Sequence, residues 1–289
     1  MYTYDLVFIG HICFDETINY DGSSNMCAGG AAMYGAVAAS CTGKKIAAML
    51  MLSPEDHREL SLLREKGIKV LTIDSPQTTR VKVVHTSSNV DERQITTVSY
   101  AGHFQDIPPL STRCVHLAGC NDHEFGLDFL RKMKRRGYSL SADMQSFVRH
   151  NDPVSKEILF KDDPAKVQAV GLMDKVKLDI LEAKILTGTD DIEKAAVIVN
   201  SWGCPEVLIT CSEGAVVRYN RQNRFEKFTN KSVIGRTGRG DTTFGAYLAW
   251  RLDHNPLESL KFAAALVSIK MEAPGPFSGT VEDVLARMK

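Results

Sequence analysis

The strongest constraint on the fold is an alternation of short apolar runs with longer segments that carry helix signals. Residues 5–10 form an apolar run that ends in glycine, and a helix of small residues is expected over 31–40. A second apolar run at 45–52 precedes a helix predicted to start after Ser53, its N-cap, and to stop at Gly67. Runs that are apolar throughout are typical of strands buried on both faces. Strands that alternate with helices predict a mainly parallel sheet covered by helices on both faces.

The same alternation continues through the second part of the chain. Strands are expected at 70–73, 114–118, 139–143, 166–172, 206–210 and 214–219, and helices at 124–136, 179–186, 192–202, 241–252, 256–271 and 281–288. With 289 residues, of which 44% are apolar, the chain is long enough to bury a large core. Neither an internal repeat nor a low-complexity linker divides it, so residues 1–289 are expected to form one α/β domain.

One region departs from this rhythm. Residues 79–86 and 93–100 are rich in β-branched side chains and partly alternate between apolar and polar positions. A polar loop at 87–92 joins them, which is the pattern of a β-hairpin. A hairpin with one polar face can stand off the main body of an α/β domain as a flap.

The charge distribution gives no sign of a nucleic-acid-binding surface. The formal net charge is zero, whereas a general binder of phosphate backbones needs a basic surplus or stripe. The densest basic cluster lies within 131–136, after an apolar stretch and just before Gly137. This position favours the last turns of a helix, where cations oppose the negative end of the helix dipole. We therefore expect no nucleic-acid partner.

The cysteine pattern and the hydropathy of the chain indicate its cellular compartment. The seven cysteines show no CxxC spacing, which disfavours a zinc site or a disulfide framework and favours reduced thiols in a cytoplasmic protein. No apolar run reaches the roughly 18 residues that a membrane span needs. The first ten residues lack the basic and apolar regions of a signal peptide. A cytoplasmic location without a membrane partner is the expectation.

The segment Gly238-Arg239-Gly240-Asp241 is the main chemical signal. Glycines at a helix start let the backbone aim free N–H groups at a ligand, and the helix dipole adds positive character there. A phosphate group suits such a place. A carboxylate beside it, such as Asp241, can accept a proton from an attacking hydroxyl. Taken alone, the motif fits equally well an Asp241 that only stabilises the helix dipole.

Residues 235–246 resemble the D-T-x-G-A-G-D-x-F-x-x-G signature of the ribokinase-like (PfkB) carbohydrate kinases. The resemblance extends over nearly the whole chain. It makes Asp241 the catalytic base and the amides of Gly238, Arg239 and Gly240 the anion hole, with Thr237 on the cofactor. The segment departs from the signature at Gly235, often Asp in the family, and at Arg239, usually Ala.

Further elements of the resemblance concern the phosphoryl acceptor. Asp15 follows the first expected strand, where the family binds substrate hydroxyls with an aspartate. Gly29 and Gly30 match the family's paired glycines. Sugar-specific members often carry Lys and Asn after this pair, and Ala31 and Tyr34 stand there instead. This departure weakens the case for ribose or fructose phosphate and leaves Tyr34 as a substrate-binding candidate.

Two arginines are further candidates for substrate contact. Residues 143–149 resemble the family's D-x-N-x-R segment with an insertion, so Arg149 is expected to face substrate or phosphate. Arg80, which opens the expected hairpin, is a weaker candidate. The hairpin matches the family's lid, which closes over substrate and excludes water. The resemblance implies lid segments at roughly 11–28 and 78–103.

The phosphoryl donor side has two matching elements. Residues 179–188 resemble the N-x-x-E-A-x-x-L-T-G element, in which Glu182 helps to hold Mg²⁺, largely through water, and Asp179 offers oxygen to a hard cation. Residues 208–215 resemble the T-x-G-x-x-G-A loop, which implies contacts of Thr210 and Gly214 with ATP. Neither a P-loop nor a GxGxxG motif after the first strand is present.

The resemblance implies a three-layer ribokinase-like α/β fold with a mainly parallel central sheet and a small β lid. It implies ATP and Mg²⁺ as cofactors and transfer of the γ-phosphoryl group to a hydroxyl of a sugar or polyol, inositol included. A nucleoside kinase stays open, because Phe14, Tyr34 or Phe104 could stack on a base. A non-catalytic sugar-binding regulator and an unrelated α/β oxidoreductase also stay open. A homodimer through the lid is a further possibility.

Overall fold

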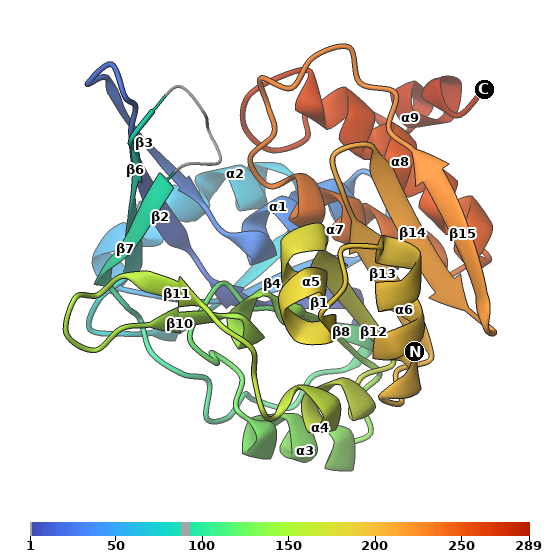
Figure 1. The fold of residues 1–289 in the computed structure, drawn as a ribbon, viewed down its shortest axis with the longest axis horizontal. Coiled ribbons are helices and arrows are strands. Elements are labelled where there is room, and N and C mark those ends of the chain that lie inside the picture. Colours follow the sequence, from blue (N-terminus) through green and yellow to red (C-terminus); the bar gives the residue numbers. More distant parts are fainter. Residues whose placement is uncertain (1, 88–92) are drawn as a thin grey trace.

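A large twisted sheet forms the centre of the molecule in the computed structural model, which describes residues 2–87 and 93–289 (Figure 1). Its strands lie in the order β15 (Gln222–Lys227), β14 (Gly214–Tyr219), β13 (Glu206–Thr210), β12 (Lys175–Asp179), β9 (Leu140–Asp143), β8 (Thr112–Ala118), β1 (Tyr4–His11), β4 (Ile46–Leu52) and β5 (Lys69–Asp74). From β13 to β5 all neighbours are parallel, and β14 and β15 are antiparallel additions at one edge. The predicted mainly parallel sheet is confirmed.

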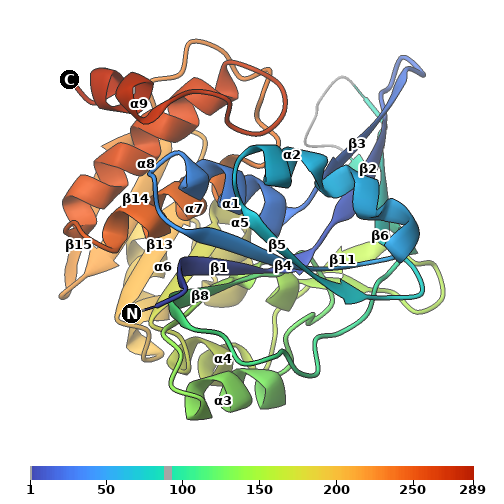
Figure 2. The same cartoon turned by 180° about the vertical axis from the view of Figure 1, so that it is seen from behind.

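Helices cover both faces of this sheet, which gives three layers (Figures 1 and 2). Side chains of β1 alternate between the faces: Leu6 and Phe8 belong to one apolar core, and Val7 and Ile9 to the other. The first core is closed by α1 (Ala31–Ser40), α2 (Ser61–Glu65), α7 (Arg239–Arg251), α8 (Pro256–Met271) and α9 (Val281–Arg287). The second is closed by α3 (Leu127–Arg135), α4 (Lys166–Gly171), α5 (Ile180–Thr187) and α6 (Ile192–Ser201).

A second, smaller sheet stands off the main body and is called the lid here (Figure 1). Its order is β3 (Ser24–Gly29), β2 (Cys13–Ile18), β6 (Thr79–His85) and β7 (Arg93–Ser99). β6 and β7 pair antiparallel, which confirms the predicted hairpin, and β2 joins β6 in parallel. Most of the polar loop expected between them, residues 88–92, lies outside the described residues. A short ribbon, β10 (Arg149–Asn151) with β11 (Ile158–Phe160), contacts the lid through a bridge between Thr96 and Glu157.

Several sequence-based assignments were wrong in detail. The strand expected at 166–172 is helix α4, which follows a turn in which the Asp163 carboxylate accepts the N–H of Ala165 at 2.7 Å. The true strand of this region is β12, a few residues later. The helix expected after Ser53 begins as a 3₁₀-helix, η1 (Pro54–Leu60), before α2. The polar edge strand β15 and the strands β2 and β3 carried no clear periodic signal.

The basic cluster of 131–136 lies at the end of α3, as predicted. Lys132 and Arg136 pair with Asp106, and Lys134 pairs with Asp174 at 2.9 Å. Within the described part of the chain, every helix is too short or too polar to cross a bilayer.

Candidate active site

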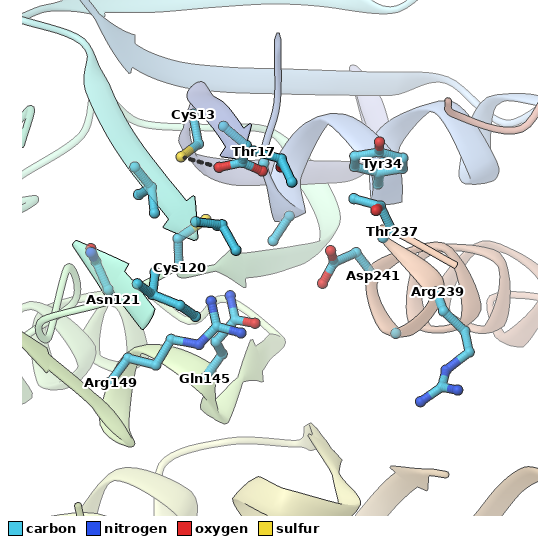
Figure 3. Close-up of a pocket in the computed structure, with 18 of the residues that line it drawn as sticks. Cys13, Thr17, Tyr34, Cys120, Asn121, Gln145, Arg149, Thr237, Arg239 and Asp241 are labelled. Carbon is cyan, nitrogen blue, oxygen red and sulfur yellow. Dashed lines mark hydrogen bonds between the residues drawn. The ribbon is translucent and has the colours of Figure 1, made fainter. Parts of the chain in front are cut away.

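A cavity of about 530 Å³ lies between the lid, the carboxyl ends of the central strands and the start of α7 (Figure 3). This is the edge where parallel α/β sheets usually bind their ligands. Most of the residues predicted for the site line it: Asp15, Gly30, Tyr34, Arg149, Asp179, Thr210, Thr237, Gly238, Arg239, Gly240 and Asp241. The fold therefore brings together residues more than 200 positions apart in the sequence, from Asp15 to Asp241.

Close packing explains the glycines at the start of α7. Gly238 is the N-cap, with φ of 72° in the left-handed region, and a Cβ there would lie 2.4 Å from the ring of Tyr34. At Gly240 a Cβ would lie 2.9 Å from Nζ of Lys177. No described backbone carbonyl accepts from the amide of Gly238 or Gly240. These two N–H groups therefore have the unpaired character expected at a helix N-terminus.

The predicted third member of the anion hole behaves differently. The amide of Arg239 donates to the carbonyl oxygen of Arg236 at 3.1 Å and closes the turn before the helix. The Arg239 side chain extends away from the Asp241 carboxylate, toward the outer part of the cavity (Figure 3). In this structure the candidate anion hole consequently depends on the amides of Gly238 and Gly240.

Asp241 lies in the first turn of α7, and its carboxylate faces the cavity (Figure 3). Burial raises the pKa of this carboxyl to about 6, and the opposing attraction of the Lys177 ammonium limits the rise. A carboxylate with a moderately raised pKa is still ionised at neutral pH and is a better proton acceptor than an ordinary aspartate.

A buried lysine beside the anion hole was missed by the sequence analysis. Lys177 in β12 is 3% exposed, and its Nζ lies 2.9 Å from Oδ2 of Asp143 and 3.8 Å from Oε2 of Glu182. Burial alone would lower the pKa of Lys177, but the carboxylates of Asp143, Glu182 and Asp241 outweigh it, and the net shift is upward. The ammonium therefore stays charged. The only sign of Lys177 in the sequence was that a lysine stands at a position where the buried strand is otherwise apolar.

Asp179 and Glu182 form a reciprocal cap on α5. The Asp179 carboxylate accepts from the amide of Glu182 at 2.8 Å, and the Glu182 carboxylate accepts from the amide of Asp179 at 2.7 Å. Asp179 lines the cavity, whereas Glu182 lies behind it and is 1% exposed. Burial and the Asp179 charge raise the pKa of Glu182, against the attraction of Lys177.

The acceptor side of the cavity is built around Asp15 in β2. The thiol of Cys13 donates to its carboxylate at 3.2 Å, and burial raises the pKa of Asp15 although Cys13 and Arg149 oppose the shift. Gly30 has φ of 104°, and a Cβ there would lie 2.8 Å from the carbonyl oxygen of His11. Its neighbour Gly29 packs against Tyr34 and does not line the cavity.

Several polar side chains of the acceptor side were not predicted. One of them, Gln145, lies in the 143–149 segment, where the motif was used only for Arg149. The others come from loops and from the lid, where neither periodicity nor a motif marks them: Thr17, Asn19, Asn25 and Asn121, together with the thiols of Cys27 and Cys120. Arg149 and Gln145 point toward the same space as Asp241 (Figure 3). The Nε of Arg149 is buried without a hydrogen-bond partner among the described residues.

Besides Gly29, three candidates do not line the cavity. Arg80 pairs with Asp56 at 3.1 Å and covers the ring of Phe14 at 4.3 Å, so it connects the lid to η1. Gly214 begins β14, where a Cβ would lie 2.2 Å from the carbonyl oxygen of Glu226, so its role in the structure is strand packing. Glu182, as described above, lies behind Asp179.

A three-layer α/β body, a β lid and a helix N-terminus with an adjacent aspartate are together the features expected of a small-molecule kinase. The family described as pfkB family carbohydrate kinase matches residues 2–282, and this chain belongs to it. The predicted family, the ribokinase-like fold and the class of kinase are thereby confirmed.

Individual relatives agree on the fold and differ in substrate. A cytidine kinase of Thermococcus kodakarensis is 27% identical over 267 residues, which cover 88% of this chain and 91% of that protein. The structure of a pyrophosphate-dependent kinase of the ribokinase family, complexed with a pyrophosphate analogue and myo-inositol, is 31% identical. Its TM-score is 0.87 over 97% of this chain and 99% of that one. The Arabidopsis thaliana ribokinase, complexed with ribose and ATP, is 17% identical with a TM-score of 0.77 and coverage of 99% of both chains.

Proposed function

We propose that this protein transfers a phosphoryl group to a hydroxyl of a cyclic polyol, of which an inositol is the best example. The observation that carries the proposal is one cavity lined by Asp15 on its acceptor side and by Asp241 at the helix N-terminus. Carboxylate, amide and hydroxyl side chains surround the acceptor space, and each can bond a hydroxyl-rich ring. The relative that carries myo-inositol is similar over 97% of this chain.

The aromatic side chains favour a polyol over a nucleoside. Of the three rings that could stack on a base, Phe14 lies under Arg80 and Phe104 is 2% exposed, and neither lines the cavity. Tyr34 lines it but packs against Gly238. A nucleoside is the alternative acceptor, because one relative is a cytidine kinase.

The proposed mechanism uses positioning and electrostatics. Asp15 orients the acceptor ring, and Asp241 accepts the proton of the attacking hydroxyl while the new P–O bond forms and the bond to the leaving phosphate breaks. The amides of Gly238 and Gly240 and the ammonium of Lys177 stabilise the negative charge on the transferred group. Arg149 faces the space between acceptor and donor.

ATP with Mg²⁺ is the proposed donor. The described residues contain no group of three or more His, Cys, Asp or Glu side chains arranged to hold a metal ion directly. However, Oε1 of Glu182 is buried without a described partner, and such a hard oxygen suits a hydrated Mg²⁺. Glu182 and Asp179 would hold the ion through water, and it would supply charge neutralisation to the donor phosphates. Thr210, whose Oγ1 is also unpartnered among the described residues, and Thr237 would contact the phosphates.

The cavity also supports pyrophosphate as a second candidate donor. Its described lining includes the cationic side chains of Arg149, Lys177, Arg236 and Arg239. A relative 31% identical is a pyrophosphate-dependent kinase. Both donors deliver a phosphoryl group to the same anion hole, so the acceptor chemistry is unchanged.

A screen of ATP–Mg²⁺ and pyrophosphate–Mg²⁺, each against inositols, simple sugars and nucleosides, tests the proposal. Phosphorylated product is measured by phosphorus NMR, which also assigns the position. We expect turnover with an inositol and a fall in kcat of about 10³-fold or more in Asp241→Asn with donor binding retained. Preferred turnover of cytidine would replace the polyol by a nucleoside. Binding of a sugar without turnover of any donor would make the protein a non-catalytic regulator.

A homodimer through the lid also stays a proposal. The large apolar side chains of Tyr20, Met26 and Val98 are exposed on the lid segments. Sedimentation equilibrium over a range of protein concentrations tests the dimer. A monomer at every concentration contradicts the proposal.

A further inference from the structure

A buried lysine lies behind the anion hole, on the side away from the cavity. Lys270 is in the last turn of α8 and is 2% exposed. Its Nζ donates hydrogen bonds to the carbonyl oxygens of Gly235 and Thr237, both in the turn that leads into α7. The same Nζ lies 5.1 Å from the centre of the Tyr34 ring, which presents its face to the charge. Two carbonyls and one ring thus match the three N–H bonds of the ammonium.

Backbone carbonyls, in place of a carboxylate, compensate the cost of burying the Lys270 ammonium. A buried ammonium normally needs a carboxylate partner. No described carboxylate forms an ion pair with Lys270, and the nearest negative contribution is the longer-range attraction of Asp241. Burial lowers the pKa of Lys270 to about 8 despite that attraction. The main partners are therefore the backbone carbonyls of the turn, as they would be for a bound cation.

The geometry of the peptide bond links these carbonyls to the anion hole. The Thr237–Gly238 peptide is trans, so the C=O of Thr237 and the N–H of Gly238 point in opposite directions. When the carbonyl is fixed on Lys270, the Gly238 amide must face the opposite side. Gly238 lines the cavity there, and no described backbone carbonyl accepts from its amide.

A second contact fixes the same turn against the end of α8. The amide of Gly235 donates to the carbonyl oxygen of Met271 at 2.9 Å. A Cβ at Gly235 would lie 1.9 Å from the carbonyl oxygen of Ala273, so no side chain fits. This explains why the chain has glycine where the family signature has Asp. The backbone approaches α8 closely enough for its carbonyls to reach Lys270.

We infer that Lys270 is a positioning residue for phosphoryl transfer, whose ammonium acts as a built-in cation that holds the Gly235 and Thr237 carbonyls and thereby aims the Gly238 amide at the transferred group. The inference rests on the proposed kinase activity of this cavity. It also implies that catalysis does not depend on an added monovalent cation, because the place of one is taken by a side chain.

The test compares two variants that differ in what they leave at this position. Lys270→Met keeps the volume and removes the charge, and Lys270→Ala leaves a space that a small cation can enter. Loss of an aligned anion-hole donor costs about 10²-fold in kcat, with little change in the acceptor KM, and we expect this loss in both variants. Ammonium chloride should restore at least a tenth of wild-type kcat to Lys270→Ala and nothing to Lys270→Met, with sodium chloride at equal ionic strength as the reference.

Controls separate positioning from folding and from the proposed function. Lys261→Ala, an exposed lysine on the same helix, should leave kcat unchanged. Pyrophosphate binding by calorimetry needs no turnover, and it should weaken in Lys270→Met even if no acceptor has been identified. If Lys270→Ala does not fold, Lys270→Met, which keeps the side-chain volume, is used for the test. Wild-type kcat and wild-type pyrophosphate affinity in Lys270→Met would overturn the inference, as would a folded Lys270→Ala that ammonium does not rescue.

Discussion

Single charged residues determine how the cavity can work. Asp241 shares its surroundings with one strongly held cation, Lys177, and with the acidic pair of Asp143 and Glu182. The low-polarity surroundings make each charge sensitive to its neighbours. Two properties of this cluster can be measured separately, the protonation of the proposed base and the stability that the buried ion pair contributes.

The pH dependence of catalysis reports the protonation of Asp241. Its pKa is raised from 3.8 to about 6 by burial, against the attraction of Lys177. Below this pKa the carboxyl group is protonated and cannot accept the hydroxyl proton, so kcat/KM should fall about tenfold per pH unit on the acid side. We expect the midpoint of the acid limb near pH 6 in a pH–rate profile measured with saturating donor. A midpoint near the ordinary aspartate value would show that another group acts as the base.

The buried ion pair of Lys177 should contribute to stability. Lys177→Met leaves the carboxylates of Asp143 and Glu182 without their cation in a buried place, which costs about 3–5 kcal/mol. The free energy of unfolding is measured by urea denaturation at neutral pH. Lys184→Met is the control, because that lysine is 59% exposed and its loss should change stability by less than about 0.5 kcal/mol. Equal stabilities of the two variants would contradict the expectation.

At the scale of elements, the crossing of α1 and α7 fixes the helix that carries Asp241. A Cβ at Gly245 of α7 would lie 2.3 Å from the carbonyl oxygen of Gly35 in α1, so the two helices touch through their backbones. The small residues at this crossing allow α7 to lie deep enough for its N-terminus to reach the cavity.

Separation of these helices should impair both stability and catalysis. Gly245→Ala forces the backbones apart, and we expect a net loss of about 1–3 kcal/mol, since overpacking outweighs the better helix propensity of alanine. The kcat value should fall as well, because the base and the anion hole move with α7. Gly126→Ala is the control: its φ is −67° and no atom lies within 4 Å of the added Cβ, so any loss of stability there reflects only the poorer N-cap preference of alanine and should leave kcat unchanged. A Gly245→Ala variant as stable and active as this control would show that the crossing tolerates the methyl group.

At the scale of the whole molecule, polar side chains connect the lid to the body, among them Thr79 with His11 and Thr97 with Asn151. Arg80 of β6 spans the two parts, because it pairs with Asp56 of η1 and covers Phe14 of β2. The hydroxyl of Thr78 also accepts from the amide of Ser53 at 2.9 Å. These polar contacts, together with Phe14 of β2, which belongs to the first apolar core, hold the lid over the cavity.

Removal of the Arg80 contact should loosen the lid. In Arg80→Ala we expect faster amide hydrogen exchange in β2, β3, β6 and β7, with exchange in the central sheet unchanged. The KM for the acceptor should rise a few-fold while the melting temperature changes little, since the guanidinium is 39% exposed. Lys82→Ala, on the same face of β6, is the control. Unchanged lid exchange in Arg80→Ala would mean that other contacts hold the lid.

The local sequence was enough to predict most elements and the catalytic segment. The bounds of α1 and α8 follow from runs of small or apolar residues with a glycine or a capped proline at the start. Asp241 became the candidate base through the resemblance of residues 235–246 to the family signature, whereas the glycine motif alone left its role open. The failures share a cause too: α4 and β12 are short, and β15 is a polar edge strand, so tertiary contacts rather than periodicity decide their structure.

What the sequence by itself determined is the alternation of strands and helices, the lid hairpin, and the placement of Asp241 in the first turn of a helix, because periodicity, capping and glycine requirements act over a few residues. Only the tertiary structure decided the partners of three cations. Lys177 forms an ion pair with Asp143, and Lys270 donates hydrogen bonds to the carbonyl oxygens of Gly235 and Thr237. Arg80 pairs with Asp56 outside the cavity. These contacts join segments that are 24 to 35 positions apart. For Lys177 and Lys270 the physical cause is the cost of leaving a buried charge unpaired, which arises only once the chain has folded.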